Sequence, residues 1–294
     1  MSADILELLN RIWPAGATML GLGTIFAIAL LIASEKLKVP LDPRIQKILQ
    51  ALPHLDCGAC GYAGCASYAK AVAEEPQLIG KCNPGGQKTT QAVAAVLNLQ
   101  ISDSGPAKKP VVHCRAHTDD KTCYAEYRGI QTCIAANALP NAQACRFGCL
   151  SFGDCCHACR FDALRIIEGL AAVDYNKCTG CGACAKACPC NLIEMVPFSY
   201  ENMIIVACSS KETGRVTKAM CKVGCIACGL CAKQTDLFTI EDNLARIDYL
   251  KYQPSENTEN ALNKCPTAVI VYRGKSAPPR QPNQKPQTVA SVNK

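Results

Sequence analysis

The stretch Cys178-Thr-Gly-Cys181-Gly-Ala-Cys184-Ala-Lys-Ala-Cys188-Pro189 decides how this chain folds. Three cysteines at this spacing wrap one cubane iron–sulfur cluster, and the fourth binds a neighbouring cluster. Small residues between the cysteines let backbone N–H groups approach the sulfides. Zinc sites also use Cys-x-x-Cys, but a third cysteine followed by Cys-Pro fits tetrahedral zinc poorly. The motif therefore predicts a ferredoxin-like fold built around [4Fe–4S] clusters.

A partner motif precedes this stretch, and it lacks one cysteine. It contains Cys149, Cys155 and Cys159, with Phe152 at the position of the middle ligand. Cys145 is the best substitute, and Cys156 is the alternative. Because the fourth cysteine of each motif binds the other cluster, the motifs predict two ligand sets: Cys159, Cys178, Cys181 and Cys184 for one cluster, and Cys145, Cys149, Cys155 and Cys188 for the other.

A later repeat predicts a ferredoxin-like module with a single cluster. Residues 164–178 parallel residues 237–252, and each stretch reads as two short strands around a tight turn. In the repeat, the four ligand positions of one cluster are occupied by Thr235, Tyr252, Ser255 and Thr258. The other ligand set is complete and predicts a [4Fe–4S] cluster on Cys225, Cys228, Cys231 and Cys265.

The first cysteine group predicts a separate [4Fe–4S] site, with a rubredoxin-like iron or zinc site as the alternative. Its members, separated by glycine-rich spacers, are Cys57, Cys60, Cys65 and Cys82. Seven cysteines remain, of which four are candidates for a further cluster: Cys114, Cys133, Cys208 and Cys221. Cys123, Cys156 and Cys190 are left without a role. The sequence thus predicts at least four [4Fe–4S] clusters, with these cysteines binding the iron.

The composition excludes a disulfide framework. The chain has 294 residues, 23 cysteines and a formal net charge of +7. The cysteine count is odd, many cysteines form Cys-x-x-Cys runs, and no cleavable secretory signal is evident.

An excess of basic over acidic residues suits an anionic membrane or an acidic protein partner. Nucleic acid is the least favoured partner, because no Lys/Arg block with interleaved aromatic residues occurs.

An apolar segment near the N-terminus predicts a single membrane-spanning helix. Residues 12–34 contain no charged residue, and roughly 20 such residues span a bilayer. Basic residues follow the segment at Lys36, Lys38, Arg44 and Lys47. Because the positive side normally stays in the cytoplasm, we expect a single-pass protein of the inner (cytoplasmic) membrane, with its N-terminus outside and its bulk in the cytoplasm. A signal peptide is disfavoured by the length of the apolar run.

These signals predict an α+β chain with six parts. Residues 1–35 form a transmembrane anchor, and residues 36–100 form the four-cysteine module. Residues 101–135 form a linker with extra cysteines. Two ferredoxin-like modules follow: residues 136–205 bind two clusters and residues 206–275 bind one. Residues 276–294, rich in Pro, Gln, Asn and Lys, are expected to be a disordered tail.

The combination of motifs resembles the B subunit of the Rnf complex. The resemblance is carried by the apolar span, by Asp56-Cys-Gly-Ala-Cys-Gly-Tyr-Ala-Gly-Cys65 with Cys82-Asn-Pro-Gly-Gly86, and by the ferredoxin repeats. Further matches are Gly129-Ile-Gln-Thr-Cys133, Phe147-Gly-Cys-Leu150, Val206-Ala-Cys-Ser-Ser210 and Cys221-Lys-Val-Gly-Cys225. Phe152 and the missing cluster of the last module depart from the family pattern.

The resemblance implies a component of a membrane-bound ferredoxin:NAD⁺ oxidoreductase that translocates Na⁺ or H⁺. The B subunit would accept electrons from soluble reduced ferredoxin and pass them to membrane partners that carry flavin and iron–sulfur groups. The NAD⁺ and flavin sites belong to other subunits, so no catalytic residue is expected in this chain. One alternative is the iron–sulfur subunit of another membrane-associated dehydrogenase, and another is a zinc-stabilised membrane adaptor.

Overall fold

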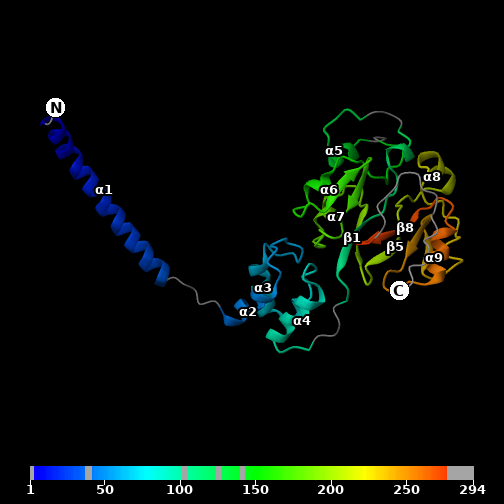
Figure 1. The fold of residues 1–294 in the computed structure, drawn as a ribbon, viewed down its shortest axis with the longest axis horizontal. Coiled ribbons are helices and arrows are strands. Elements are labelled where there is room, and N and C mark those ends of the chain that lie inside the picture. Colours follow the sequence, from blue (N-terminus) through cyan, green and yellow to red (C-terminus); the bar gives the residue numbers. More distant parts are fainter. Residues whose placement is uncertain (1–2, 37–41, 101–104, 124–126, 140–142, 277–294) are drawn as a thin grey trace. The chain divides into compact units, whose positions relative to one another are not determined.

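The computed structural model describes residues 3–36, 42–100, 105–123, 127–139 and 143–276. The chain divides into two compact units, residues 1–46 and 47–294 (Figure 1). Except for Ser276, the predicted tail lies outside the described residues, as do residues 101–104 of the predicted linker.

The first unit contains the long helix α1 (Ala3–Lys36), with Pro14 inside it. Its segment Gly16–Lys36 is long and apolar enough to cross a membrane, with a mean hydropathy of 2.1 and no residue of its most apolar window buried. The single apolar helix predicted at the N-terminus is therefore confirmed.

The second unit begins with a helical bundle. It contains the C-terminal part of α2 (Pro43–Ala51), then α3 (Cys65–Glu74), the short 3₁₀ helix η1 (Pro76–Leu78) and α4 (Gly86–Val96). Buried side chains come from each α-helix, including Ile48, Val72 and Val93. The hydroxyl of Tyr68 donates to the carbonyl of Leu78 at 3.0 Å. This small core supports the loops that carry the first four cysteines.

The strands of the described residues pair two by two in antiparallel order. The pairs are β1 (Lys108–Val112) with β4 (Ile193–Pro197), β2 (Leu164–Ile167) with β3 (Leu170–Val173), β5 (Asn202–Val206) with β8 (Ile270–Gly274), and β6 (Phe238–Glu241) with β7 (Leu244–Ile247). Short helices connect them: η2 (Thr118–Asp120), α5 (Cys133–Asn137), α6 (Asp154–His157), α7 (Ala183–Ala187), α8 (Gly214–Met220) and α9 (Glu256–Asn263). The predicted α+β class is confirmed.

Both predicted hairpins are confirmed, as β2–β3 and β6–β7. Their two-residue turns are Glu168-Gly169 and Asp242-Asn243, and all four residues have positive φ between 48° and 75°. Turns with two positive φ values follow the right-handed twist of paired strands. The internal repeat thus produces two copies of one local structure.

Strand β1 interrupts the linker predicted at residues 101–135. It pairs with β4 through Val112 and Ile193, and Val111 is completely buried. The predicted boundary at residues 205/206 also falls inside strand β5. Both differences arise because antiparallel pairing joins segments more than 60 residues apart, a contact that local composition does not signal. Val111, Val196 and Ile205 pack together, so the two sheets share a small core.

Protein side chains fill the place where the repeat lacks ligands. Tyr252 is 5% exposed, and its hydroxyl accepts the N–H of Ile204 at 3.3 Å. Ser255 caps α9 by accepting the N–H of Thr258, which is itself buried. Residues aligned with cysteine ligands here form an ordinary capped helix.

Candidate metal centres

The four cysteines of the first module lie together around the start of α3; they are named the N-terminal set (Cys57, Cys60, Cys65 and Cys82). The carboxylate of Asp56 accepts the N–H of Cys65 at 2.6 Å and so fixes the first turn of the helix. A Cβ at position 64 would lie 2.8 Å from the same carboxylate oxygen, so a larger residue there would displace the Asp56 side chain. Burial raises the pKa of Cys82, and the nearby sulfurs of the other three cysteines raise it further.

The predicted set Cys159, Cys178, Cys181 and Cys184, named the central set, is also brought together. Burial raises the pKa of Cys184 to about 12, and Cys178 and Cys181 add to the shift. The sulfur of Cys159 accepts the N–H of Ala163 at 3.4 Å. Between two of the ligands, Gly180 has a φ of +77°, and a Cβ there would clash with the carbonyl of Lys108.

The last module presents its predicted cysteines to one cavity of about 340 Å³. The burial of Cys231 raises its pKa to about 11, and the neighbouring cysteines raise it further. All four members of this C-terminal set line the cavity: Cys225, Cys228, Cys231 and Cys265.

The remaining ferredoxin-like site differs from its predicted composition. A cavity of about 380 Å³ is lined by Cys133, Cys149, Cys155, Cys188 and Cys190. Neither Cys145, the predicted substitute for the ligand missing at Phe152, nor the alternative Cys156 lines it. Cys133 lies here instead.

Asp154 explains why Cys133 reaches this cavity. Its carboxylate accepts the N–H groups of Cys133 at 2.9 Å and Ile134 at 3.0 Å, which ties the start of α5 to the start of α6. The sulfur of Cys133 accepts backbone N–H groups from residues 152–154. The Cys133 thiol therefore lies beside the loop that carries Phe152. Asp154, two positions after Phe152, is the sequence feature that could have indicated this placement of Cys133.

Cys190 also lines this cavity and makes a side-chain hydrogen bond to α5. Its thiol donates to the side-chain oxygen of Asn137 at 3.5 Å, and burial raises its pKa to about 12. Three of the lining cysteines belong to the predicted ligand set, and Cys133 is tied to the same loop through Asp154, so the name α5 set is used for Cys133, Cys149, Cys155 and Cys188.

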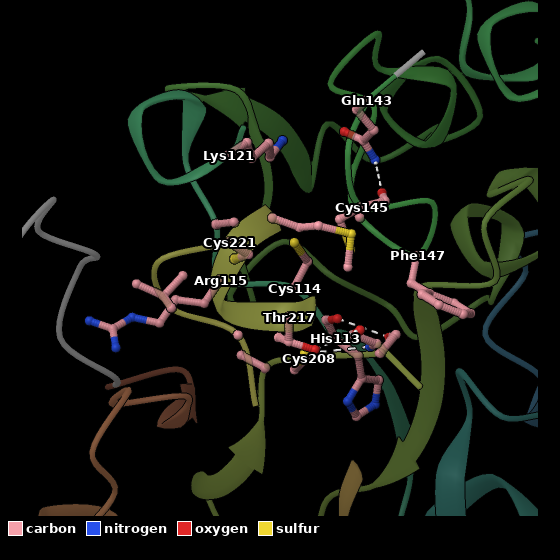
Figure 2. A pocket seen from close by; sticks show the side chains of 18 residues that line it. His113, Cys114, Arg115, Lys121, Gln143, Cys145, Phe147, Cys208, Thr217 and Cys221 are labelled. Atoms are coloured by element: carbon pink, nitrogen blue, oxygen red, sulfur yellow. Dashed lines mark hydrogen bonds between the residues drawn. The ribbon is translucent and has the colours of Figure 1, made fainter. Parts of the chain in front are cut away.

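A third cavity, of about 500 Å³, gathers cysteines from distant segments (Figure 2). The candidate further site was predicted as Cys114, Cys133, Cys208 and Cys221. In the structure Cys133 is absent from the lining and Cys145 takes its place. Cys133 and Cys145 thus each line a different cavity from the one expected from the sequence. Cys123 is exposed and lines none of these three cavities.

The chemistry of these groups fits iron–sulfur clusters. Burial alone disfavours a thiolate, and iron offsets that cost by supplying positive charge. Backbone N–H groups that donate to the sulfurs stabilise the remaining negative charge. Among the described residues, no three His, Cys, Asp or Glu side chains lie close enough to hold a single metal ion. Metal analysis distinguishes a cluster from a zinc site.

Two family models match the chain. One, described as "Putative Fe-S cluster", matches residues 52–84, which contain the whole N-terminal set. The other, described as "4Fe-4S binding domain", matches residues 171–194, which contain the motif from Cys178 to Cys188.

Similar proteins extend this result over most of the chain. The B subunit of the Na⁺-translocating ferredoxin:NAD⁺ oxidoreductase complex of Acetobacterium woodii is 37% identical over 86% of this chain and 77% of its own length. The B subunit of the ion-translocating oxidoreductase complex of Methanosarcina acetivorans is 34% identical over 80% of this chain and 89% of its own length. The B subunit of the proton-translocating ferredoxin:NAD⁺ oxidoreductase complex of Clostridium ljungdahlii is 35% identical over 85% of this chain and 88% of its own length. The chain therefore belongs to the family of B subunits of ion-translocating oxidoreductase (Rnf) complexes.

Proposed function

We propose that this chain is the electron-relay component of a membrane-bound, ion-translocating ferredoxin:NAD⁺ oxidoreductase complex. It accepts electrons from reduced ferredoxin and passes them to membrane partners that carry flavin and iron–sulfur groups. The observation that carries the proposal is the grouping of cysteines into separate four-membered sets within one compact unit. When bound, [4Fe–4S] clusters supply one-electron transfer.

At least four clusters are proposed, on the N-terminal, α5, central and C-terminal sets. The chain contributes the thiolates, the short hairpins that hold them apart and the backbone N–H groups that surround them. The NAD⁺ and flavin sites are proposed to lie on other subunits.

The basic charge of the chain supports an acidic soluble donor. The formal net charge is +7, and exposed basic residues such as Arg215 and Lys218 lie on the ferredoxin-like part of the chain. Opposite charges accelerate encounter, and salt screens the attraction. Reduced ferredoxin is therefore proposed to deliver electrons to this part of the chain.

The route toward the membrane is proposed to run through the N-terminal set. Cys57 follows the end of α1 by 21 residues. Asn83, next to Cys82, donates from its side-chain amide to the carbonyls of Gly180 and Lys108 and accepts the N–H of Lys108 at 2.8 Å. Because Gly180 lies between two ligands of the central set, a single side chain connects the two sets. This contact supports electron transfer between them.

The helix α1 is proposed to cross the inner membrane with its N-terminus outside, so that the cysteine sets lie in the cytoplasm. Protease added to intact spheroplasts should then leave the chain beyond residue 46 uncut, while protease added to inverted vesicles should digest it. Digestion in intact spheroplasts would reverse the proposed orientation.

The ligand set of the α5 site is tested by Cys133→Ala. Loss of one thiolate should remove that cluster or convert it to a three-iron form, so iron should fall by one to about four atoms per chain. The electron paramagnetic resonance (EPR) spectrum of the reduced protein should change accordingly. Cys156→Ala is the matched control, and it should retain the wild-type iron content. Loss of iron in Cys156→Ala but not in Cys133→Ala would reassign the site.

The direction of the relay is tested by Cys60→Ala in the complete complex. Ferredoxin should still reduce the other clusters, but ferredoxin-driven NAD⁺ reduction should fall at least tenfold because the exit to the membrane partners is lost. Reduction of the chain is followed by its visible absorption, and NAD⁺ reduction is followed separately. Normal NAD⁺ reduction in this variant would show that electrons leave elsewhere.

A further inference from the structure

The cavity of about 500 Å³ is built from segments far apart in the sequence. Cys114 follows strand β1, Cys208 follows strand β5, Cys221 ends helix α8, and Cys145 lies in the loop between α5 and α6. The loop of Cys114 and the end of α8 are joined where Lys121 pairs with Cys221 in an isolated antiparallel bridge. Figure 2 shows the four cysteines around the same space. We name them the bridging set.

This cavity is larger than the cavities lined by the C-terminal set and by the α5 set. The complete Cys-x-x-Cys-x-x-Cys motif of the C-terminal set lines a cavity of about 340 Å³, and the α5 set lines one of about 380 Å³. Cys114, Cys145, Cys208 and Cys221 therefore line a hollow comparable with the one that the C-terminal set lines.

The sulfurs of the bridging set accept hydrogen bonds from the backbone. The N–H groups of Ser210 and Cys225 donate to the sulfur of Cys208 at 3.5 and 3.4 Å. Cys145 and Cys221 accept backbone N–H groups from residues two or three positions later in the chain. Cys178 of the central set accepts the N–H of Gly180 in the same way. Donors aimed at sulfur stabilise a metal-bound thiolate, whereas a thiol serving only to fill space has no need of them.

Two contacts connect this cavity to neighbouring sets. Cys225, whose N–H donates to Cys208, is itself a member of the C-terminal set. On the other side, the ammonium of Lys121 donates to the carbonyl of Cys149, a member of the α5 set, at 2.6 Å. The cavity therefore lies between the two ferredoxin-like parts of the chain.

From these observations we propose that Cys114, Cys145, Cys208 and Cys221 bind a further [4Fe–4S] cluster, which connects the C-terminal set to the α5 set. The connecting role rests on the electron relay proposed above, but the binding of the cluster does not. Binding releases the thiol protons to solvent as four Fe–S bonds form. In the relay one electron enters from one side and one leaves to the other, and no bond is made or broken.

The proposal is tested with Cys145→Ala in the full chain, purified without oxygen from the complex. Relative to the control Cys123→Ala, iron and acid-labile sulfide should both fall, by up to about four atoms of each per chain, and one EPR signal of the reduced protein should disappear or become that of a three-iron cluster. The double variant Cys133→Ala/Cys145→Ala should show both losses together, because the two cysteines serve different clusters.

Two results would overturn the proposal. One is unchanged iron and sulfide in Cys145→Ala. The other is loss of zinc in place of iron, which would make the cavity a zinc site. If Cys145→Ala does not accumulate, Cys145→Ser, which keeps the volume of the side chain, should still alter the EPR signal, and an unaltered signal overturns the proposal. Normal ferredoxin-driven NAD⁺ reduction despite the expected loss of iron would count against the connecting role alone, not against the cluster.

Discussion

Buried cysteine sulfur is the constraint on which the rest of this structure depends. Burial raises the pKa of Cys184 and Cys208 to about 12 and that of Cys231 to about 11, so their thiolates require positive charge nearby. The strands are four or five residues long and pair only two by two in the described part of the chain. Two-stranded sheets of this size are marginally stable alone. Iron–thiolate bonds between distant segments would supply the stabilisation that these small cores lack.

The site that carries no cysteines shows how the same scaffold manages without a cluster. Where the central set has Cys178, the repeat has Tyr252, a buried ring whose hydroxyl accepts a backbone N–H. Where the central set continues with two more ligands, the repeat has Ser255 and Thr258, which cap and pack the eight-residue helix α9. The equivalent helix α7 has five residues. Hydrogen bonds and apolar packing thus replace the metal where the ligands are absent.

Local patterns predicted the parts of the site that lie close together in the sequence. The turns Glu168-Gly169 and Asp242-Asn243 and the apolar helix were foreseen because each depends on a few adjacent residues. The pairing of β1 with β4 was not foreseen. Nor was the finding that Cys133 and Cys145 line different cavities from those expected. Cys133 reaches its cavity through Asp154, 21 residues away, and Cys145 meets Cys208 only when two modules pack together. Contacts of this kind follow from tertiary packing, which cysteine spacing alone does not encode.

The central claim is that these cysteine sets hold iron–sulfur clusters that relay electrons, rather than single metal ions that only support the fold. Iron, acid-labile sulfide and zinc, measured together on protein purified without oxygen, test it most directly. The account predicts iron and sulfide in equal amounts, at least about sixteen of each per chain at four per cluster, with no stoichiometric zinc. Zinc in place of iron, or iron without sulfide, would contradict it.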